Sequence, residues 1–160
     1  MGVSGSGKTT IGEHLAADLG WAFYDGDDFH PDENIEKMRS GLPLSDADRV
    51  PWLTALRNLI AASLNQKRHA VLACSALKAS YRAQLLIDDR VILVYLKGDP
   101  ALIKQRLRGR QGHFMKSDML ASQLADLEEP ESGFRVDIAE SIEQIVRNVK
   151  TFIKHAVRKS

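Results

Sequence analysis

Residues Gly2 to Thr9 match the motif GxxxxGK[ST] at every defined position. In this motif small residues let the backbone curl so that successive N–H groups face phosphate oxygens. Lys8 reaches the β- and γ-phosphates, the Thr9 hydroxyl ligates Mg²⁺, and the following helix adds its positive end. We therefore expect a site for ATP and Mg²⁺ formed by Gly2, Val3, Ser4, Gly5, Ser6, Gly7, Lys8, Thr9 and Thr10.

Three acidic side chains, Asp25, Asp27 and Asp28, follow a short predicted strand at residues 21–24. Open α/β sheets bind their ligands at such carboxyl ends of strands. One carboxylate can hold a Mg²⁺ ion and another can accept or aim the proton of an attacking hydroxyl. We expect Asp25 to join Thr9 in the metal shell and Asp27 to orient the acceptor. The alternative is an exposed acidic turn without a catalytic role.

Two pairs of basic side chains have the i, i+4 spacing of one helical face. Arg106 and Arg110 adjoin a polar segment punctuated by Gly112, an arrangement typical of a lid that closes on a nucleotide. We expect both to bind the nucleotide, and Arg110 to act in catalysis with Lys8 and Asp27. Lys78 and Arg82 follow the predicted buried strand at 70–74, which favours a functional role. For either pair a solvated basic face is the alternative.

Other nucleotide-binding classes lack their accompanying motifs. A GTPase should carry DxxG and NKxD, and neither occurs in the chain. An ATPase motor should end a hydrophobic strand in an acidic residue linked to Mg²⁺. The strand at 70–74 instead runs into Ser75-Ala76-Leu77-Lys78, and Asp99 before Pro100 is typical of a helix cap. These absences favour a small-molecule kinase.

Hydrophobic patterns predict strands and helices in alternation. Continuous apolar runs predict strands at 21–24, 70–74, 91–96 and 134–138. Stripes of apolar residues predict helices at 8–19, 33–39, 46–64, from 100, at 117–127 and from 141, where Ser141 and Gln144 form a capping box. This alternation predicts an α/β fold with a parallel sheet and helices on both faces.

The phosphate-binding motif begins one residue after the first residue of the sequence. Such a motif ordinarily follows a buried parallel strand of about 5–6 residues. We therefore expect the first strand of the sheet to be missing from this sequence, which then starts inside a longer natural chain.

Length and composition fit a single globular domain over residues 1–160, with 44% hydrophobic residues. Lys and Arg number 22 against 21 Asp and Glu, so charge gives no reason to expect nucleic-acid or membrane partners. The single cysteine, Cys74, is typical of a buried residue in a reducing compartment. No apolar run is long enough to span a membrane. We expect a cytoplasmic protein whose partner is a small molecule.

Further short segments accompany the phosphate-binding motif, namely Asp25-Gly26-Asp27-Asp28-Phe29-His30-Pro31, Gly41-Leu42-Pro43-Leu44, Pro51-Trp52-Leu53, Cys74-Ser75-Ala76-Leu77-Lys78, Tyr95-Leu96-Lys97-Gly98 and Arg110-Gln111-Gly112-His113-Phe114-Met115. With these segments the chain closely resembles the gluconokinase family over most of residues 2–130. Shikimate kinases and nucleoside monophosphate kinases share the fold but lack DGDDFHP and CSALK.

The resemblance implies a P-loop NTPase fold of the nucleoside-monophosphate and shikimate kinase type, with an acceptor-binding region at about 28–52 and a lid at about 106–118. It also implies a homodimer that transfers the γ-phosphoryl group of ATP to the 6-hydroxyl of D-gluconate. The carboxylate of gluconate needs a cation, and its hydroxyls need donors and acceptors. The expected acceptor-binding residues are Asp27, His30, Asn34, Arg49, Lys78 and Arg82.

Two other functions stay open. One is a kinase of another small acceptor on the same fold, such as shikimate or a nucleoside monophosphate. The other is a nucleotide-binding regulatory protein without turnover. Release of ADP over a panel of acceptors separates the three.

Overall fold

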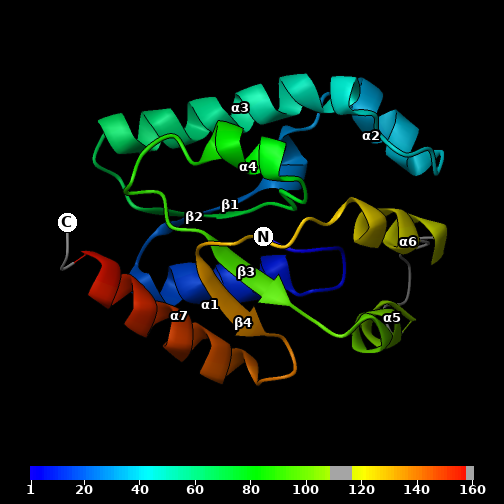
Figure 1. The fold of residues 1–160 in the computed structure, drawn as a ribbon. Coiled ribbons are helices and arrows are strands. Elements are labelled where there is room, and N and C mark those ends of the chain that lie inside the picture. Colours follow the sequence, from blue (N-terminus) through cyan, green and yellow to red (C-terminus); the bar gives the residue numbers. More distant parts are fainter. Residues whose placement is uncertain (109–116, 158–160) are drawn as a thin grey trace.

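The computed structural model describes residues 1–108 and 117–157 (Figure 1). Strands and helices alternate along the chain in the order that the sequence predicts. The elements are α1 (Lys8–Leu19), β1 (Ala22–Asp25), the short 3₁₀ helix η1 (Gly26–Phe29), α2 (Asp32–Arg39), α3 (Asp46–Asn65), β2 (Ala70–Ala73), α4 (Ala79–Leu85), β3 (Val94–Lys97), α5 (Pro100–Arg108), α6 (Ser117–Asp126), β4 (Phe134–Asp137) and α7 (Ile142–Val157).

The strands pair in parallel, as predicted, but among the described residues they form two separate two-stranded sheets rather than the single sheet expected. β1 pairs with β2 so that Ala22 lies opposite Ala70, and β3 pairs with β4 so that Val94 lies opposite Phe134. Residues 1 and 2 lie between the two pairs. The Leu96 N–H donates to the Met1 carbonyl at 3.0 Å, and the Gly2 N–H donates to the Ser75 carbonyl at 3.2 Å. The phosphate-binding loop therefore starts between β2 and β3. The expectation that a further strand precedes the loop in a longer natural chain stays a prediction.

Helices cover the strands on two sides, as predicted (Figure 1). α1 packs against β1, β2 and α7, and α7 also packs against β4. α3 and α4 pack together on the opposite side of β1 and β2. One hydrophobic cluster joins Val3 to buried residues of α1, α5, α6 and α7, and a second joins Trp52 to residues of α3 and α4. The P-loop and the acidic turn after β1 therefore each adjoin a packed core.

Local signals explain where two of the helices, α3 and α7, begin. The side chain of Ser45 accepts from the Asp48 N–H, and Asp48 Oδ2 accepts from the Ser45 N–H. Together these two bonds make a full capping box for α3. At the start of α7 the Ser141 hydroxyl accepts from the Gln144 N–H, while the Gln144 side chain donates to Asn148. Half of the predicted capping box at residue 141 is thus present.

Two elements were not predicted. η1 follows β1 directly because the Asp25 side chain accepts from the Asp27 N–H and starts the turn. α4 is a helix of seven residues without a side-chain cap, so no sequence signal marks its start. The third strand begins at Val94 rather than at residue 91. Within the part of the chain that the structure describes, no helix has the length and apolar character needed to cross a membrane.

Candidate active site

The loop from Gly2 to Thr9 has a curled backbone that its glycines make possible. Gly5 and Gly7 have φ values of 82° and 90°, in the left-handed region that favours glycine. A Cβ at Gly5 would also lie 2.9 Å from the Leu107 side chain on α5. The Lys8 ammonium donates to the Val3 carbonyl at 3.1 Å, which folds the lysine back over the loop. The loop is therefore shaped by glycine and closed by its lysine.

Two further observations are consistent with triphosphate binding by the same loop. α1 begins at Lys8, so the first N–H groups of a twelve-residue helix point toward the loop. The Ser6 hydroxyl is fully buried and has no hydrogen-bond partner among the described residues. Buried polar atoms are nearly always paired, so an unpaired one beside this helix start is consistent with a ligand-binding loop.

The acidic turn after β1 lies directly beside the loop. The Thr9 hydroxyl donates to Asp25 Oδ2 at 2.7 Å, and Asp25 Oδ1 accepts from the Asp27 N–H at 3.1 Å. Hydroxyl and carboxylate oxygens are ligands that Mg²⁺ prefers, and Mg²⁺ commonly takes the rest of its shell from phosphates and water. No group of three or more His, Cys, Asp or Glu gathers for a metal ion within 1–108 and 117–157. Thr9 and Asp25 together therefore fit a metal that the nucleotide also holds.

Trp52 on α3 fixes the position of the acidic turn. Its indole N–H donates to the Gly26 carbonyl at 2.7 Å, and its side chain is fully buried. On the other side of the turn, a Cβ at Gly26 would lie 2.8 Å from the Ala73 carbonyl at the end of β2. Gly26 is the residue between Asp25 and Asp27. The Trp52 hydrogen bond on one side and the close approach of β2 on the other therefore hold both carboxylates at the strand end.

His30 and Asn34 lie next to this turn. The His30 ring stacks on Trp52 with ring centres 4.7 Å apart and planes 6° from parallel. Burial lowers the pKa of His30 below its ordinary value, although Asp27 opposes the shift. The Asn34 amide is buried and donates to the Asp48 carbonyl at 2.7 Å, with His30 Nδ1 at 3.4 Å. His30 is thus held near Asp27, and Asn34 is held next to His30.

Two cations from different parts of the chain meet at one carboxylate. Arg49 on α3 and Lys78 before α4 lie 3.6 Å and 2.8 Å from Asp46 Oδ1. The Tyr81 hydroxyl donates to the same oxygen and accepts from the Arg49 guanidinium. The hydrogen bond to Asp46 raises the pKa of Lys78, so the ammonium keeps its charge. We call Arg49, Lys78, Tyr81 and Asp46 the cation cluster.

Arg82 is buried and faces the protein backbone rather than this cluster. Its guanidinium donates to the carbonyls of Ala76 at 3.2 Å and Leu77 at 2.8 Å. Ala76 has a φ of 43°, a left-handed conformation that costs energy for a residue with a Cβ. Arg82 therefore stabilises the turn that leads to Lys78.

The two predicted nucleotide-binding arginines have different positions. Arg106 on α5 donates to the Ile138 carbonyl at 2.7 Å, which joins α5 to the end of β4. Arg110 and most of the predicted lid at 106–118 lie outside the described residues. The role of both arginines stays a prediction.

α6 brings two further residues to the site that no sequence motif indicated. The Ser4 N–H in the phosphate-binding loop donates to Gln123 Oε1 at 2.7 Å. One turn later, the Asp126 carboxylate lies 3.8 Å from Arg49 and 3.9 Å from Lys78. The three-residue spacing places Gln123 and Asp126 on one helical face, and it is the one signal that the sequence held.

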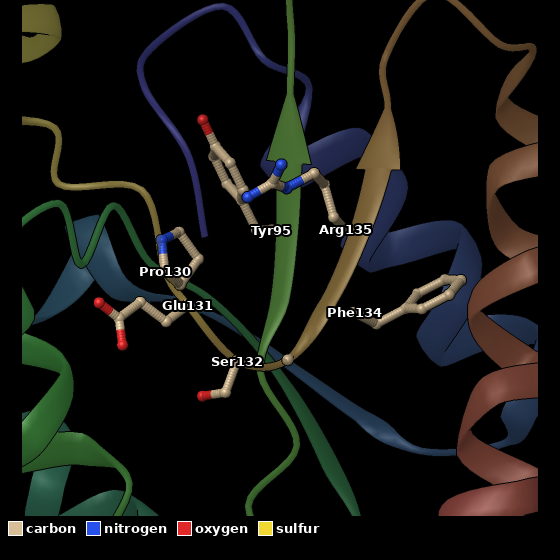
Figure 2. Close-up of a pocket in the computed structure, with 7 residues that line it drawn as sticks. Tyr95, Pro130, Glu131, Ser132, Phe134 and Arg135 are labelled. Atoms are coloured by element: carbon tan, nitrogen blue, oxygen red, sulfur yellow. The ribbon is translucent and has the colours of Figure 1, made fainter.

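A separate hollow of about 220 Å³ lies at the start of β4, lined by Tyr95, Pro130, Glu131, Ser132, Gly133, Phe134 and Arg135 (Figure 2). Arg135 lies over the Tyr95 ring and pairs with Glu129 at 3.2 Å. In a parallel sheet the start of β4 is at the opposite edge from the P-loop and the acidic turn. This hollow is therefore not part of the candidate site.

Comparison with known proteins identifies the family. A family model described as shikimate kinase matches residues 4–155. The thermoresistant gluconokinase of Escherichia coli is 43% identical, with 96% of this chain and 91% of that protein covered. The chain belongs to the gluconokinase family. A gluconokinase of Gluconobacter oxydans is 50% identical over 81% of this chain and 74% of its own length.

A solved gluconokinase structure from Sinorhizobium meliloti has the same fold, with a TM-score of 0.88 and 39% identity, covering all of this chain and 94% of that chain. The shikimate kinase of Aquifex aeolicus shares the fold alone, with a TM-score of 0.59 and 17% identity. The gluconokinase family membership confirms the predicted α/β P-loop kinase fold and the prediction of an ATP-dependent kinase.

Proposed function

We propose that the protein transfers the γ-phosphoryl group of ATP to the 6-hydroxyl of D-gluconate, which yields 6-phospho-D-gluconate and ADP. The supporting observation is the 2.7 Å contact between Thr9 and Asp25, which joins the phosphate-binding loop to the acidic turn. A phosphate donor site and an acceptor-orienting carboxylate are the two parts that phosphoryl transfer needs. Relatives named gluconokinase extend over nearly the whole chain.

In this proposal the P-loop, Lys8 and the start of α1 hold the triphosphate. Thr9 and Asp25 hold Mg²⁺, which when bound neutralises charge on the phosphate oxygens. Asp27 accepts a hydrogen bond from the attacking hydroxyl and aims it at the γ-phosphorus. Arg106 and Arg110 add positive charge on the nucleotide side.

The acceptor occupies the region of about residues 28–52 beside the cation cluster. Arg49 and Lys78 bind the gluconate carboxylate, and Asn34 and His30 bind hydroxyl groups. Because its guanidinium is buried on backbone carbonyls, Arg82 serves the acceptor indirectly, through the turn that carries Lys78.

A coupled assay for ADP release tests the acceptor. The purified enzyme is offered D-gluconate, other sugar acids, shikimate and nucleoside monophosphates with MgATP. We expect kcat/KM to be highest for D-gluconate by at least about 100-fold, since buried polar groups reject acceptors that leave them unpaired. Preference for shikimate or a nucleotide would overturn the proposal, and so would tight ATP binding without turnover.

We also propose that the enzyme is a homodimer, on the strength of the family resemblance. Sedimentation equilibrium at micromolar concentration tests this assembly. A mass of 17.8 kDa, that of one chain, would contradict it.

A further inference from the structure

α6 contacts both halves of the active site, although it carries none of the family motifs that the sequence showed. Its apolar residues Leu120 and Leu124, with Leu127 just after the helix, pack into the hydrophobic cluster that contains Val3 of the P-loop and Leu77 of the turn before α4. The helix, the loop and the turn thus share one packed core. A shift in one of them is passed to the other two, because close-packed interiors deform little.

The polar side of the helix bonds to the P-loop through one side chain. Gln123 Oε1 accepts from the Ser4 N–H at 2.7 Å, at a half-buried position. Ser4 lies one residue before Gly5, where the loop turns into its left-handed conformation. A backbone N–H that lost this acceptor would be left unpaired in a partly buried place, so Gln123 stabilises the loop in this shape.

The next turn of the same helix contacts the cation cluster. Asp126 lies 3.8 Å from Arg49 and 3.9 Å from Lys78, and all three side chains are half-buried. Just beyond the helix, the Glu128 carboxylate accepts from the Ala79 N–H at 2.6 Å, and the Glu128 N–H donates to the Leu77 carbonyl at 3.0 Å. The segment therefore holds Lys78 through its side chain and through the backbone on both sides of it.

We propose that Gln123 and Asp126 are positioning residues that couple the two substrate sites: Gln123 holds the P-loop, and Asp126 holds the cations that receive the acceptor. The inference rests on the proposed function for the identity of the acceptor. A nucleotide that fixes the loop at Ser4 also fixes α6, and with it the cations. Their side chains then lose less freedom when the acceptor binds, which makes acceptor binding tighter.

Titration calorimetry on the full chain measures this coupling without turnover. The Kd of D-gluconate is measured alone and with a saturating non-hydrolysable β,γ-imido analogue of ATP and Mg²⁺. We expect the analogue to tighten gluconate binding about 5-fold or more in the wild type. The substitution Gln123→Leu should weaken binding of the analogue itself by about 5- to 10-fold. It should also reduce the coupling, the ratio of the gluconate Kd without the analogue to that with it, to nearly 1.

Asp126→Asn separates coupling from nucleotide binding. Because Gln123 and the P-loop are intact in this variant, the Kd of the analogue should stay within about 2-fold of wild type. The effect of the analogue on gluconate binding should still fall to nearly 1-fold. Ser122→Ala, at an exposed position of the same helix, is the matched control and should keep the full coupling. Mere loss of helix stability would lower Tm without changing the coupling ratio.

Two outcomes are distinct. A wild type that neither binds nor phosphorylates D-gluconate would overturn the proposed function and this inference with it. A wild type that phosphorylates gluconate but shows no coupling, or variants that keep the full coupling, would overturn the inference alone.

Discussion

The contact between Trp52 and Gly26 gives a prediction about how the carboxylates of Asp25 and Asp27 are held. Trp52→Phe keeps an aromatic ring for His30 to stack on but removes the N–H that bonds to the Gly26 carbonyl at 2.7 Å. An unpaired buried carbonyl costs about 1–3 kcal/mol, so the free energy of unfolding should fall by about that amount. Urea denaturation measures this loss.

The same change should lower kcat more than it alters substrate binding. Gly26 lies between Asp25 and Asp27, and a shift of about 1 Å in a reacting group can cost about 100-fold in rate. A smaller shift of the turn should lower kcat by about 10-fold or more, while the KM for ATP changes by less than about 3-fold. Steady-state kinetics with both substrates varied gives the two constants.

Trp21→Phe is the matched control for this experiment. Trp21 precedes the start of β1, at the other end of the strand from the acidic turn, and it stacks on His69 with ring centres 4.8 Å apart. Its replacement should leave kcat unchanged. If Trp52→Phe loses stability but keeps the wild-type kcat, the indole is a packing residue and the reasoning is wrong.

Three further predictions concern single side chains. Lys8→Ala removes the cation of the P-loop and should abolish measurable turnover; retained turnover would disprove the site. Asp27→Asn should lower kcat by about 100-fold or more with little change in the KM for gluconate, and an unchanged kcat would refute its orienting role. Burial raises the pKa of Cys74 to about 11, so at pH 8 the thiol holds its proton and the folded enzyme should resist iodoacetamide. Alkylation should appear after unfolding in urea, and rapid labelling of the native enzyme, followed by mass spectrometry, would contradict the burial of Cys74.

The sequence could predict the parts of the fold and site that depend on local patterns. The P-loop follows from residue types at fixed spacing, and α1 begins at Lys8 as its stripe of apolar residues predicts. The meeting of Thr9 and Asp25 could also be predicted, because a parallel sheet brings its carboxyl ends to one edge.

Contacts between distant side chains and the backbone could not be predicted. The bonds from Trp52 to Gly26 and from Gln123 to Ser4 depend on where tertiary packing places α3 and α6, which no short motif encodes. Arg82 shows the same limit. Its spacing from Lys78 indicated a shared face, yet burial directs its guanidinium to the carbonyls of a strained turn. Helix periodicity predicts which face a residue shares, and the tertiary packing decides what that face contacts.

The central claim is that the P-loop and the acidic turn act together to phosphorylate the terminal hydroxyl of D-gluconate. The most direct measurement is nuclear magnetic resonance of the product formed from ¹³C-labelled D-gluconate and MgATP. The account predicts one product, with coupling between phosphorus and carbon 6, formed in step with ADP. A phosphate on any other carbon, or ADP released without a phosphorylated acid, would contradict it.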